Sequence, residues 1–170
     1  MLLSLALPAV LGMAFARALV ERRCNLVLIA RSAEPLHSLA AELRRSSRVA
    51  VIAIELDLSG SGAAHIFAEQ LARGGVPIEL LVNCAGFALR RAFRHLSLPR
   101  QLEMLRLNAE AIVELTYSLL LGMLERPQKG IINISSAGFQ PIPFASVYSA
   151  TKALLTAFSP ALEQEHTAVA

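Results

Sequence analysis

Residues 25–56 read NLVLIARSAEPLHSLAAELRRSSRVAVIAIEL and contain the pattern that decides the fold. Two short apolar runs, 25–30 and 49–56, flank a stretch in which apolar residues recur every three or four positions. Short runs without polar alternation are typical of strands buried on both faces, and the periodicity between them predicts an amphipathic helix. A strand–helix–strand unit of this kind places two parallel strands in one sheet.

The same alternation extends over most of the chain. We expect further strands over 78–83 and 130–135, and helices over 12–23, 62–74, 99–125 and 146–163. Strands that alternate with longer helices indicate a doubly wound parallel sheet with helices on both faces. Because the 170 residues contain no internal repeat and no linker, residues 1–170 are predicted to form a single α/β domain.

Composition excludes several classes of function. A chain that is 55% hydrophobic and 17% charged is globular rather than disordered. The net charge of +3 is scattered, without a basic stripe that carries aromatic residues, so a nucleic-acid partner is not expected. Cys24 and Cys84 form no CxxC pattern and the histidines show no ligand spacing. We therefore predict neither disulfides nor a metal site, and expect a cytoplasmic protein.

Two uncharged stretches were candidates for membrane or targeting segments. Residues 131–151 contain prolines and several polar side chains, so they do not form a continuous apolar span. Residues 1–16 are apolar and end in Ala14-Phe15-Ala16, a pattern typical of a signal-peptidase site. However, no Lys or Arg precedes this run, and a helical pattern continues through it to Glu21. We predict no membrane partner, and export remains the alternative interpretation of this segment.

Polar residues follow the expected strands at the points where they end. Arg31 and Ser32 follow the strand 25–30, Asp57 and Leu58 follow 49–56, and the residues Asn83-Cys84-Ala85-Gly86 close 78–83. In doubly wound sheets ligands bind beyond the carboxyl ends of the strands. The sequence therefore predicts a ligand site at this edge.

Three residues near the end of the chain have the spacing of a catalytic group. Ser135, Tyr148 and Lys152 form the pattern S-x12-Y-x3-K. Tyr148 and Lys152 lie one helical turn apart on the same face, and a nearby ammonium favours the phenolate form of a tyrosine. Ser135 would close a strand, where its hydroxyl could donate a hydrogen bond to a carbonyl oxygen. An isolated Y-x3-K would be interpreted as a helix-surface pair, but here the other motifs accompany it.

Taken together, these motifs resemble those of the short-chain dehydrogenase/reductase family. The matching stretches are NCAG (83–86), Asn108 in RLNAEA, NISSAGFQPIPFASVYSATKAL (133–154) and Asp57 in LDLS, within a resemblance that runs from Gly12 to about Glu165. The resemblance implies a Rossmann-like fold that binds NAD(P). It also implies hydride transfer between a nicotinamide and a small carbonyl or secondary alcohol substrate.

The resemblance assigns a role to each catalytic residue. Tyr148 would exchange the proton at the substrate oxygen, and Lys152 would hold the ribose hydroxyls and favour the tyrosine phenolate. Ser135 would position the carbonyl. Asn108 would anchor a water in a proton relay with Lys152; the alternative is a mid-helix asparagine whose side chain bonds the backbone.

The resemblance also implies a set of cofactor contacts besides Tyr148 and Lys152: Gly12, Arg31, Ser32, Asp57, Leu58, Asn83, Ala85 and Gly86. Asp57, with Leu58, would meet the adenine edge, the alternative being a strand-end cap. A guanidinium at Arg31, beside Ser32, suits a ribose 2′-phosphate, so NADP(H) is favoured and NAD(H) remains possible. The alternative for Arg31 is an ordinary solvated side chain.

The expected phosphate loop departs from the family pattern. Where the family has T-G-x-x-x-G-x-G, residues 5–12 read LALPAVLG, so two of the three glycines are absent. Val10 adds a β-branched side chain and Pro8 removes an N–H donor, so pyrophosphate binding is expected to be poor. Codons for V-T-G-A-S-S-G read one base late give S-L-A-L-P-A-V, which is residues 4–10. We hypothesise that a short frameshift produced this segment.

The other end of the chain also differs from the family. The sequence stops after the tyrosine helix, whereas family members continue through further strands, so we expect C-terminal strands to be missing and one sheet edge to be bare. The resemblance suggests a homo-dimer or homo-tetramer through 99–125 and 146–163. Two functions remain open: an NADP-preferring enzyme, or a catalytically inactive remnant with impaired cofactor binding.

Overall fold

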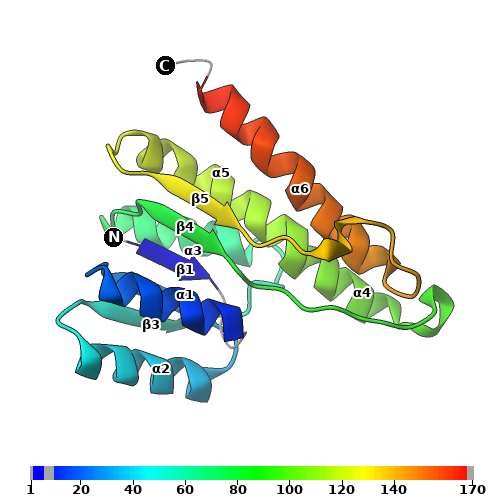
Figure 1. The fold of residues 1–170 in the computed structure, drawn as a ribbon, viewed down its shortest axis with the longest axis horizontal. Helices are drawn as coiled ribbons and strands as arrows, with labels where there is room; N and C mark the ends of the chain where they lie inside the picture. Colours follow the sequence, from blue (N-terminus) through cyan, green and yellow to red (C-terminus); the bar gives the residue numbers. More distant parts are fainter. Residues whose placement is uncertain (1, 6–9, 168–170) are drawn as a thin grey trace.

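The computed structural model describes residues 2–5 and 10–167. At its centre lies a parallel sheet in the order β3-β2-β1-β4-β5 (Figure 1). The strands are β1 (Leu2–Leu5), β2 (Leu26–Ala30), β3 (Val51–Glu55), β4 (Leu80–Asn83) and β5 (Gly130–Asn133). The chain crosses from one half of the sheet to the other after β3, so the predicted doubly wound α/β fold is confirmed.

Helices connect the strands close to the predicted positions. They are α1 (Val10–Glu21), α2 (Ala33–Ser46), α3 (Ala63–Arg73), α4 (Leu98–Leu105), α5 (Ala111–Leu124) and α6 (Ser146–Thr167). Two short 3-10 helices, η1 (Phe93–His95) and η3 (Ala137–Phe139), were not predicted. The single helix expected over 99–125 is instead α4 and α5 joined by a π-helix, η2 (Arg106–Glu110).

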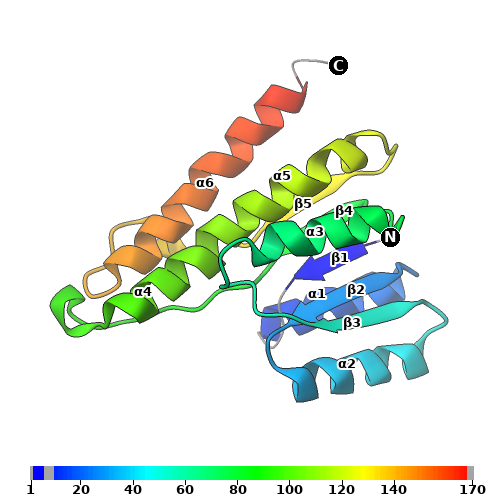
Figure 2. The same cartoon turned by 180° about the vertical axis from the view of Figure 1, so that it is seen from behind.

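Helices cover both faces of the sheet (Figures 1 and 2), and each face has its own apolar core. Leu26 and Leu28 of β2 join the core made with α1 and α2, whereas Val27 and Ile29 join the core made with α3 and α5. All four side chains are fully buried. Successive strand residues point to opposite faces, so a strand covered on both faces requires an unbroken apolar run.

The N-terminal segment supplies the central strand. The backbone of β1 pairs in parallel with β2 on one side and with β4 on the other. Ala6 and Pro8 of the altered phosphate loop fall outside the described residues. After this loop α1 begins at Val10, which is 80% exposed, and Gly12 is buried within its first turn.

Strand β5 forms one edge of the described sheet, as predicted, with β4 as its one neighbour among residues 2–5 and 10–167. Helix α6 packs against α4 and η2 (Figure 2). The helical stretch Leu98–Leu124 has the length and apolar composition of a membrane span, with a mean hydropathy of 1.3. However, 44% of its most apolar 18-residue window is buried inside this fold, and a core helix of a globular protein meets the same criteria.

Candidate active site

Lys152 is the most deeply placed charged group at the ligand edge of the sheet. It is 7% exposed, and its Nζ donates a 2.7 Å hydrogen bond to the carbonyl oxygen of Ile134, just beyond β5. The same Nζ lies 5.9 Å from the centre of the Tyr148 ring. Burial lowers the pKa of Lys152, and the neighbouring Cys84 partly offsets this. The predicted Tyr–Lys pair therefore sits at the mouth of β5, with its cation largely removed from water.

Two serine hydroxyls follow β5, and their environments differ. The Oγ of Ser135 lies 3.1 Å from the carbonyl oxygen of Lys152, to which it donates, and 2.9 Å from the hydroxyl of Thr156. The hydroxyl of Thr156 donates to the same carbonyl at 3.0 Å. The Oγ of Ser136 accepts a bond from the N–H of Gly138 at 3.2 Å, and its own proton has no acceptor among the described residues. The predicted role of Ser135 thus requires its hydroxyl to turn away from α6.

Gly138 is a site residue that the sequence analysis did not identify. A Cβ at this position would lie 2.7 Å from Cε1 and 3.2 Å from Cδ1 of Tyr148, which is closer than side-chain atoms tolerate. Glycine here leaves the space that the tyrosine ring occupies. The G-F-Q-P stretch ahead of the tyrosine was the available signal.

Asn108 lies at the π-helix and is fully buried. Its Oδ1 accepts from the N–H of Phe87 at 3.1 Å, and its Nδ2 donates to the carbonyl of Phe87 at 2.9 Å and to Thr151 at 3.3 Å. Thr151 in turn donates to the carbonyl of Tyr148 at 2.7 Å. The side chain of Asn108 therefore connects the loop after β4 to the tyrosine helix. It does bond a backbone, but one that is remote from its own helix. The water relay stays a prediction.

Gly86 accommodates Asn108. A Cβ on Gly86 would lie 2.9 Å from the Oδ1 of Asn108, an amide whose position is fixed by two bonds to Phe87. The prediction placed Gly86 beside the cofactor because backbone would pass close to it. The structure gives a second reason for glycine at this position: a Cβ here would collide with the buried side chain of Asn108.

Asn83 ends β4 and is 1% exposed. Its Nδ2 donates to the Oδ1 of Asn133 at 2.7 Å, and Asn133 donates to Ser159 at 2.9 Å. The Oδ1 of Asn83 is buried and accepts no hydrogen bond from the described residues. Such an unpaired acceptor costs free energy unless a ligand or water fills it. Asn133 and Ser159 were not identified from the sequence, because the pairing of β4 with β5 fixes the first contact and the packing of α6 beside β5 fixes the second.

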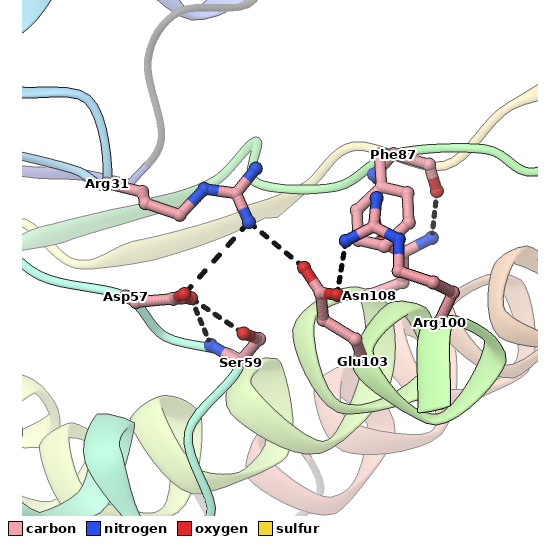
Figure 3. A network of polar contacts seen from close by, with 7 residues as sticks. All are labelled: Arg31, Asp57, Ser59, Phe87, Arg100, Glu103 and Asn108. Carbon is pink, nitrogen blue, oxygen red and sulfur yellow. Dashed lines mark hydrogen bonds and ion pairs between the residues drawn. The ribbon is translucent and has the colours of Figure 1, made fainter. Parts of the chain in front are cut away.

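A polar network covers the strand ends at β2 and β3 (Figure 3). The Nη1 of Arg31 lies 3.0 Å from Oε1 of Glu103 and 4.0 Å from Oδ2 of Asp57. Glu103 also pairs with Arg100, whose guanidinium stacks 4.9 Å from the ring centre of Phe87. Arg31 is therefore paired rather than simply solvated, and Glu103 and Arg100 are members of the site that the sequence analysis missed.

Asp57 is held by the turn that follows β3. Its Oδ1 accepts bonds from the N–H and the hydroxyl of Ser59 at 2.9 and 2.7 Å. Burial alone would raise the pKa of Asp57, but the bonds from Ser59 and the charge of Arg31 lower it overall. The strand-end cap that the sequence analysis left open is therefore present, while the adenine contact remains a prediction.

The remaining predicted cofactor contacts are distributed unevenly around this edge. Ser32 is exposed at the start of α2, beside Arg31. Ala85 is 8% exposed, and the side chain of Leu58 belongs to the core packed under α3. The ligand edge of the sheet thus offers a cation at Lys152, an unpaired hydrogen-bond acceptor at Asn83 and a network of charged side chains around Arg31. These features fit the nucleoside and nicotinamide ends of a dinucleotide, whereas the loop predicted to bind the pyrophosphate includes residues outside the described part of the chain.

The sequence that carries these groups matches the model of a known protein family. A family model described as short chain dehydrogenase aligns with residues 8–169, which is nearly the whole chain. The chain belongs to the short-chain dehydrogenase family. The resemblance inferred from the sequence motifs is thereby confirmed, and similar proteins are named as a dehydrogenase and a reductase.

This short-chain dehydrogenase is similar to several characterised proteins. Human 17-beta-hydroxysteroid dehydrogenase type 3 is 36% identical over 162 residues, which is 93% of this chain and 51% of that protein. Very-long-chain 3-oxoacyl-CoA reductase of Bos taurus is 32% identical over 161 residues, 92% of this chain and 51% of that one. The chain spans about half the length of these relatives.

A solved structure agrees with the fold in detail. A short-chain dehydrogenase from Sphingobium yanoikuyae in complex with NADPH is 31% identical, with a TM-score of 0.88. The match covers 96% of this chain and 64% of that one. The short-chain dehydrogenase family uses NAD or NADP, and the neighbour's complex shows that this architecture holds the phosphorylated form.

Proposed function

We propose that this short-chain dehydrogenase is an NADP-preferring carbonyl reductase or secondary-alcohol dehydrogenase with Tyr148 as its acid/base. The observation that carries the proposal is the buried Lys152, held at the mouth of β5 beside the Tyr148 ring. The names of two similar proteins support the proposal, since one is a hydroxysteroid dehydrogenase and the other an oxoacyl-CoA reductase. We infer a carbonyl or secondary-alcohol substrate on this basis.

The chemistry divides between the cofactor and the chain. A nicotinamide cofactor supplies the hydride for the carbonyl carbon when bound, or accepts it from the alcohol. Tyr148 Oη donates its proton to the carbonyl oxygen during reduction and takes one from the alcohol during oxidation. The charge of Lys152 favours the phenolate that reduction leaves behind. Its Nζ, which now donates to the carbonyl of Ile134, would hold ribose hydroxyls.

The carbonyl oxygen needs a second hydrogen bond to fix its position. The sequence assigns this bond to Ser135, whose proton now points to the carbonyl of Lys152. Ser136 is the alternative, because its Oγ only accepts a bond and its proton is available. Comparing Ser135→Ala with Ser136→Ala separates the two assignments: the serine that serves the substrate is the one whose loss lowers kcat.

Arg31 supports the preference for NADP. A guanidinium binds phosphate in a two-pronged geometry that ribose hydroxyls cannot match. Arg31 lies at the end of β2, beside the exposed Ser32, where the 2′ position of an adenosine ribose is expected in this fold. NAD remains the second choice of cofactor.

A second candidate function is that of a non-catalytic family member with impaired cofactor binding. The observation in its favour is Val10, which begins α1 where the family pattern expects glycine and is 80% exposed. A β-branched side chain at a helix N-terminus obstructs close approach of a pyrophosphate to the backbone N–H groups. On this interpretation the intact Tyr148 and Lys152 are inherited without being used.

We further propose that the protein associates into homo-dimers or homo-tetramers in the cytoplasm. Large apolar side chains are exposed along α4 and α5, and their spacing within each helix places them on one side: Leu98, Leu102, Leu105, Val113, Tyr117 and Leu121. Tyr117 and Leu121 are 78% and 76% exposed. An apolar stripe of this kind is typical of an interaction surface.

Ligand-induced stabilisation separates the two functions. Thermal unfolding of the purified chain is measured with NADPH, with NADH and without either, because a ligand that binds only the folded state raises its stability. The reductase proposal expects a higher Tm with NADPH than with NADH, and consumption of NADPH with small ketones. An unchanged Tm with both cofactors would support the non-catalytic alternative.

A further inference from the structure

We infer that Glu103 limits the preference of this chain for NADP by competing with the ribose 2′-phosphate for Arg31. The inference rests on the proposed function in one respect: it takes the end of β2 as the adenosine side of the cofactor site. It concerns a residue in α4 that lies 72 positions from Arg31 in the sequence.

The geometry places the carboxylate of Glu103 at the donor that a phosphate would use. Oε1 of Glu103 lies 3.0 Å from Nη1 of Arg31, and Oδ2 of Asp57 lies 4.0 Å from the same nitrogen (Figure 3). The two residues extend toward each other across the ligand edge, one from the end of β2 and the other from α4. A phosphate that binds Arg31 through two N–H groups has to compete with this carboxylate.

Glu103 is also held from its other side. Arg100 pairs with the Oε2 of Glu103, and its guanidinium stacks over the ring of Phe87 at 4.9 Å. The side chain of Glu103 is 22% exposed, compared with 56% for Arg31. The carboxylate is therefore fixed on α4, whereas Arg31 has more freedom to move between Glu103 and a ligand.

The charges in this network cancel. Arg31 and Arg100 carry two positive charges, and Asp57 and Glu103 carry two negative ones. A 2′-phosphate brings between one and two negative charges near pH 7, so it meets repulsion from Glu103 as well as attraction to Arg31. A ribose 2′-hydroxyl is neutral and can donate to a carboxylate. Glu103 therefore opposes a phosphate at this position without opposing a hydroxyl.

The test uses two nucleotide fragments, adenosine 2′,5′-bisphosphate and 5′-AMP, which differ in the 2′-phosphate. Neither contains a nicotinamide, so binding is measured by titration calorimetry without any turnover. Glu103→Gln is expected to tighten the binding of the bisphosphate about fivefold, the upper range for an exposed ion pair, with 5′-AMP binding unchanged. The effect should weaken as salt is added, because it is electrostatic.

Two further variants control for the origin of the effect. Glu125→Gln removes the same charge from an exposed position at the end of α5, and should change neither affinity. In the Arg31→Gln background the gain from Glu103→Gln should largely disappear, because Glu103 weakens phosphate binding mainly by occupying the guanidinium of Arg31. Thermal unfolding of each variant confirms that it is folded.

The inference is overturned if Glu103→Gln leaves the ratio of the two affinities unchanged, or if the same gain persists without Arg31. It is also overturned if neither the wild type nor Glu103→Gln binds the bisphosphate at millimolar concentration. Failure of the proposed function has a different signature: NADPH would not stabilise the chain, while the affinity ratio of the two fragments would still respond to Glu103→Gln.

Discussion

At the scale of single residues, the site depends on where a few side chains are buried. The cation of Lys152 is 7% exposed and donates a hydrogen bond to the carbonyl of Ile134. Removing a charge from water is costly, and burial accordingly lowers the pKa of this lysine. Such a placement is typical of functional groups rather than of surface lysines.

Tyr148→Phe tests the proposed acid/base directly. Loss of the hydroxyl should lower kcat for carbonyl reduction by roughly 10²- to 10⁴-fold, the usual contribution of a positioned acid or base. Binding of NADPH and the Tm should change little, because the ring is retained. Tyr117→Phe is the matched control, since Tyr117 is 78% exposed on α5. Equal kcat values for the two variants would contradict the assignment.

The charge of Asp57 should make the free energy of unfolding depend on pH. Its pKa in the folded protein lies below the ordinary value of 3.8, so its contribution is present above that value and is lost as pH falls through the lowered pKa. Asp57→Asn should therefore unfold at lower urea concentration than the wild type near pH 7. The difference should shrink below about pH 4. A difference that stays constant down to about pH 2.5 would show that Asp57 contributes nothing through its charge.

At the scale of elements, the π-helix η2 is the most informative departure from regular structure. The N–H of Ala111 bonds the carbonyl of Arg106, five residues earlier, and Asn108 lies within this wider turn. π-turns within α-helices occur frequently at functional sites. Here the turn coincides with a buried asparagine that joins β4 to α6, so the site depends on three elements remaining together.

Asn108→Ala should cost stability in proportion to the bonds it removes. The variant leaves both backbone groups of the half-buried Phe87 without their partner and also removes the bond to Thr151, and each lost hydrogen bond costs about 0.5–1.5 kcal/mol. We expect a loss of about 2 kcal/mol or more in urea unfolding. Asn25→Ala is the control, because Asn25 also bonds a backbone N–H, that of Ala50, but at an exposed site. Equal losses in the two variants would show that burial does not determine the effect.

Two glycines should respond to alanine with opposite signs. Gly138→Ala places a Cβ 2.7 Å from the Tyr148 ring, so η3 or the tyrosine must shift and both Tm and kcat should fall. Gly122→Ala places a Cβ in open space within α5, where alanine is the better helix former by about 1 kcal/mol. Thermal unfolding and steady-state kinetics of both variants check this. A stabilised Gly138→Ala with normal kcat would contradict the packing argument.

At the scale of the whole molecule, the two faces of the α4–α5 stretch differ in what covers them. One side contributes Met104, Leu115 and Met123 to the interior, and the other leaves large apolar side chains exposed. Its length and apolar composition would also suit a membrane span. We favour association between copies of the chain, because the inner face is already committed to the core shared with α3.

Leu121→Glu should weaken this association. Leu121 is 76% exposed on α5, so a charge there should not disturb the core but would be buried at a subunit interface, at a high cost. Sedimentation velocity should show a shift toward monomer. Ala41→Glu is the control, because Ala41 is exposed on α2, which packs on the opposite face of the sheet from α5. If both variants sediment like the wild type, α5 is not the interface.

Much of this protein follows from the sequence by itself. The unbroken apolar run of β2 can only be satisfied between two covered faces, and the strand–helix alternation then determines the parallel sheet. The spacing of Tyr148 and Lys152 puts the two side chains on one helix face, and together with the other motifs it identifies the family. These features are local, so short-range periodicity is enough to predict them.

Tertiary structure decided the contacts between residues far apart in the chain. The pairing of Arg31 with Glu103, of Asn83 with Asn133 and of Gly138 with the Tyr148 ring each joins separate elements. The direction of the Ser135 hydroxyl was decided in the same way, by the packing of α6 against the end of β5. No spacing encodes such contacts, because they depend on how strands and helices are placed around the whole sheet.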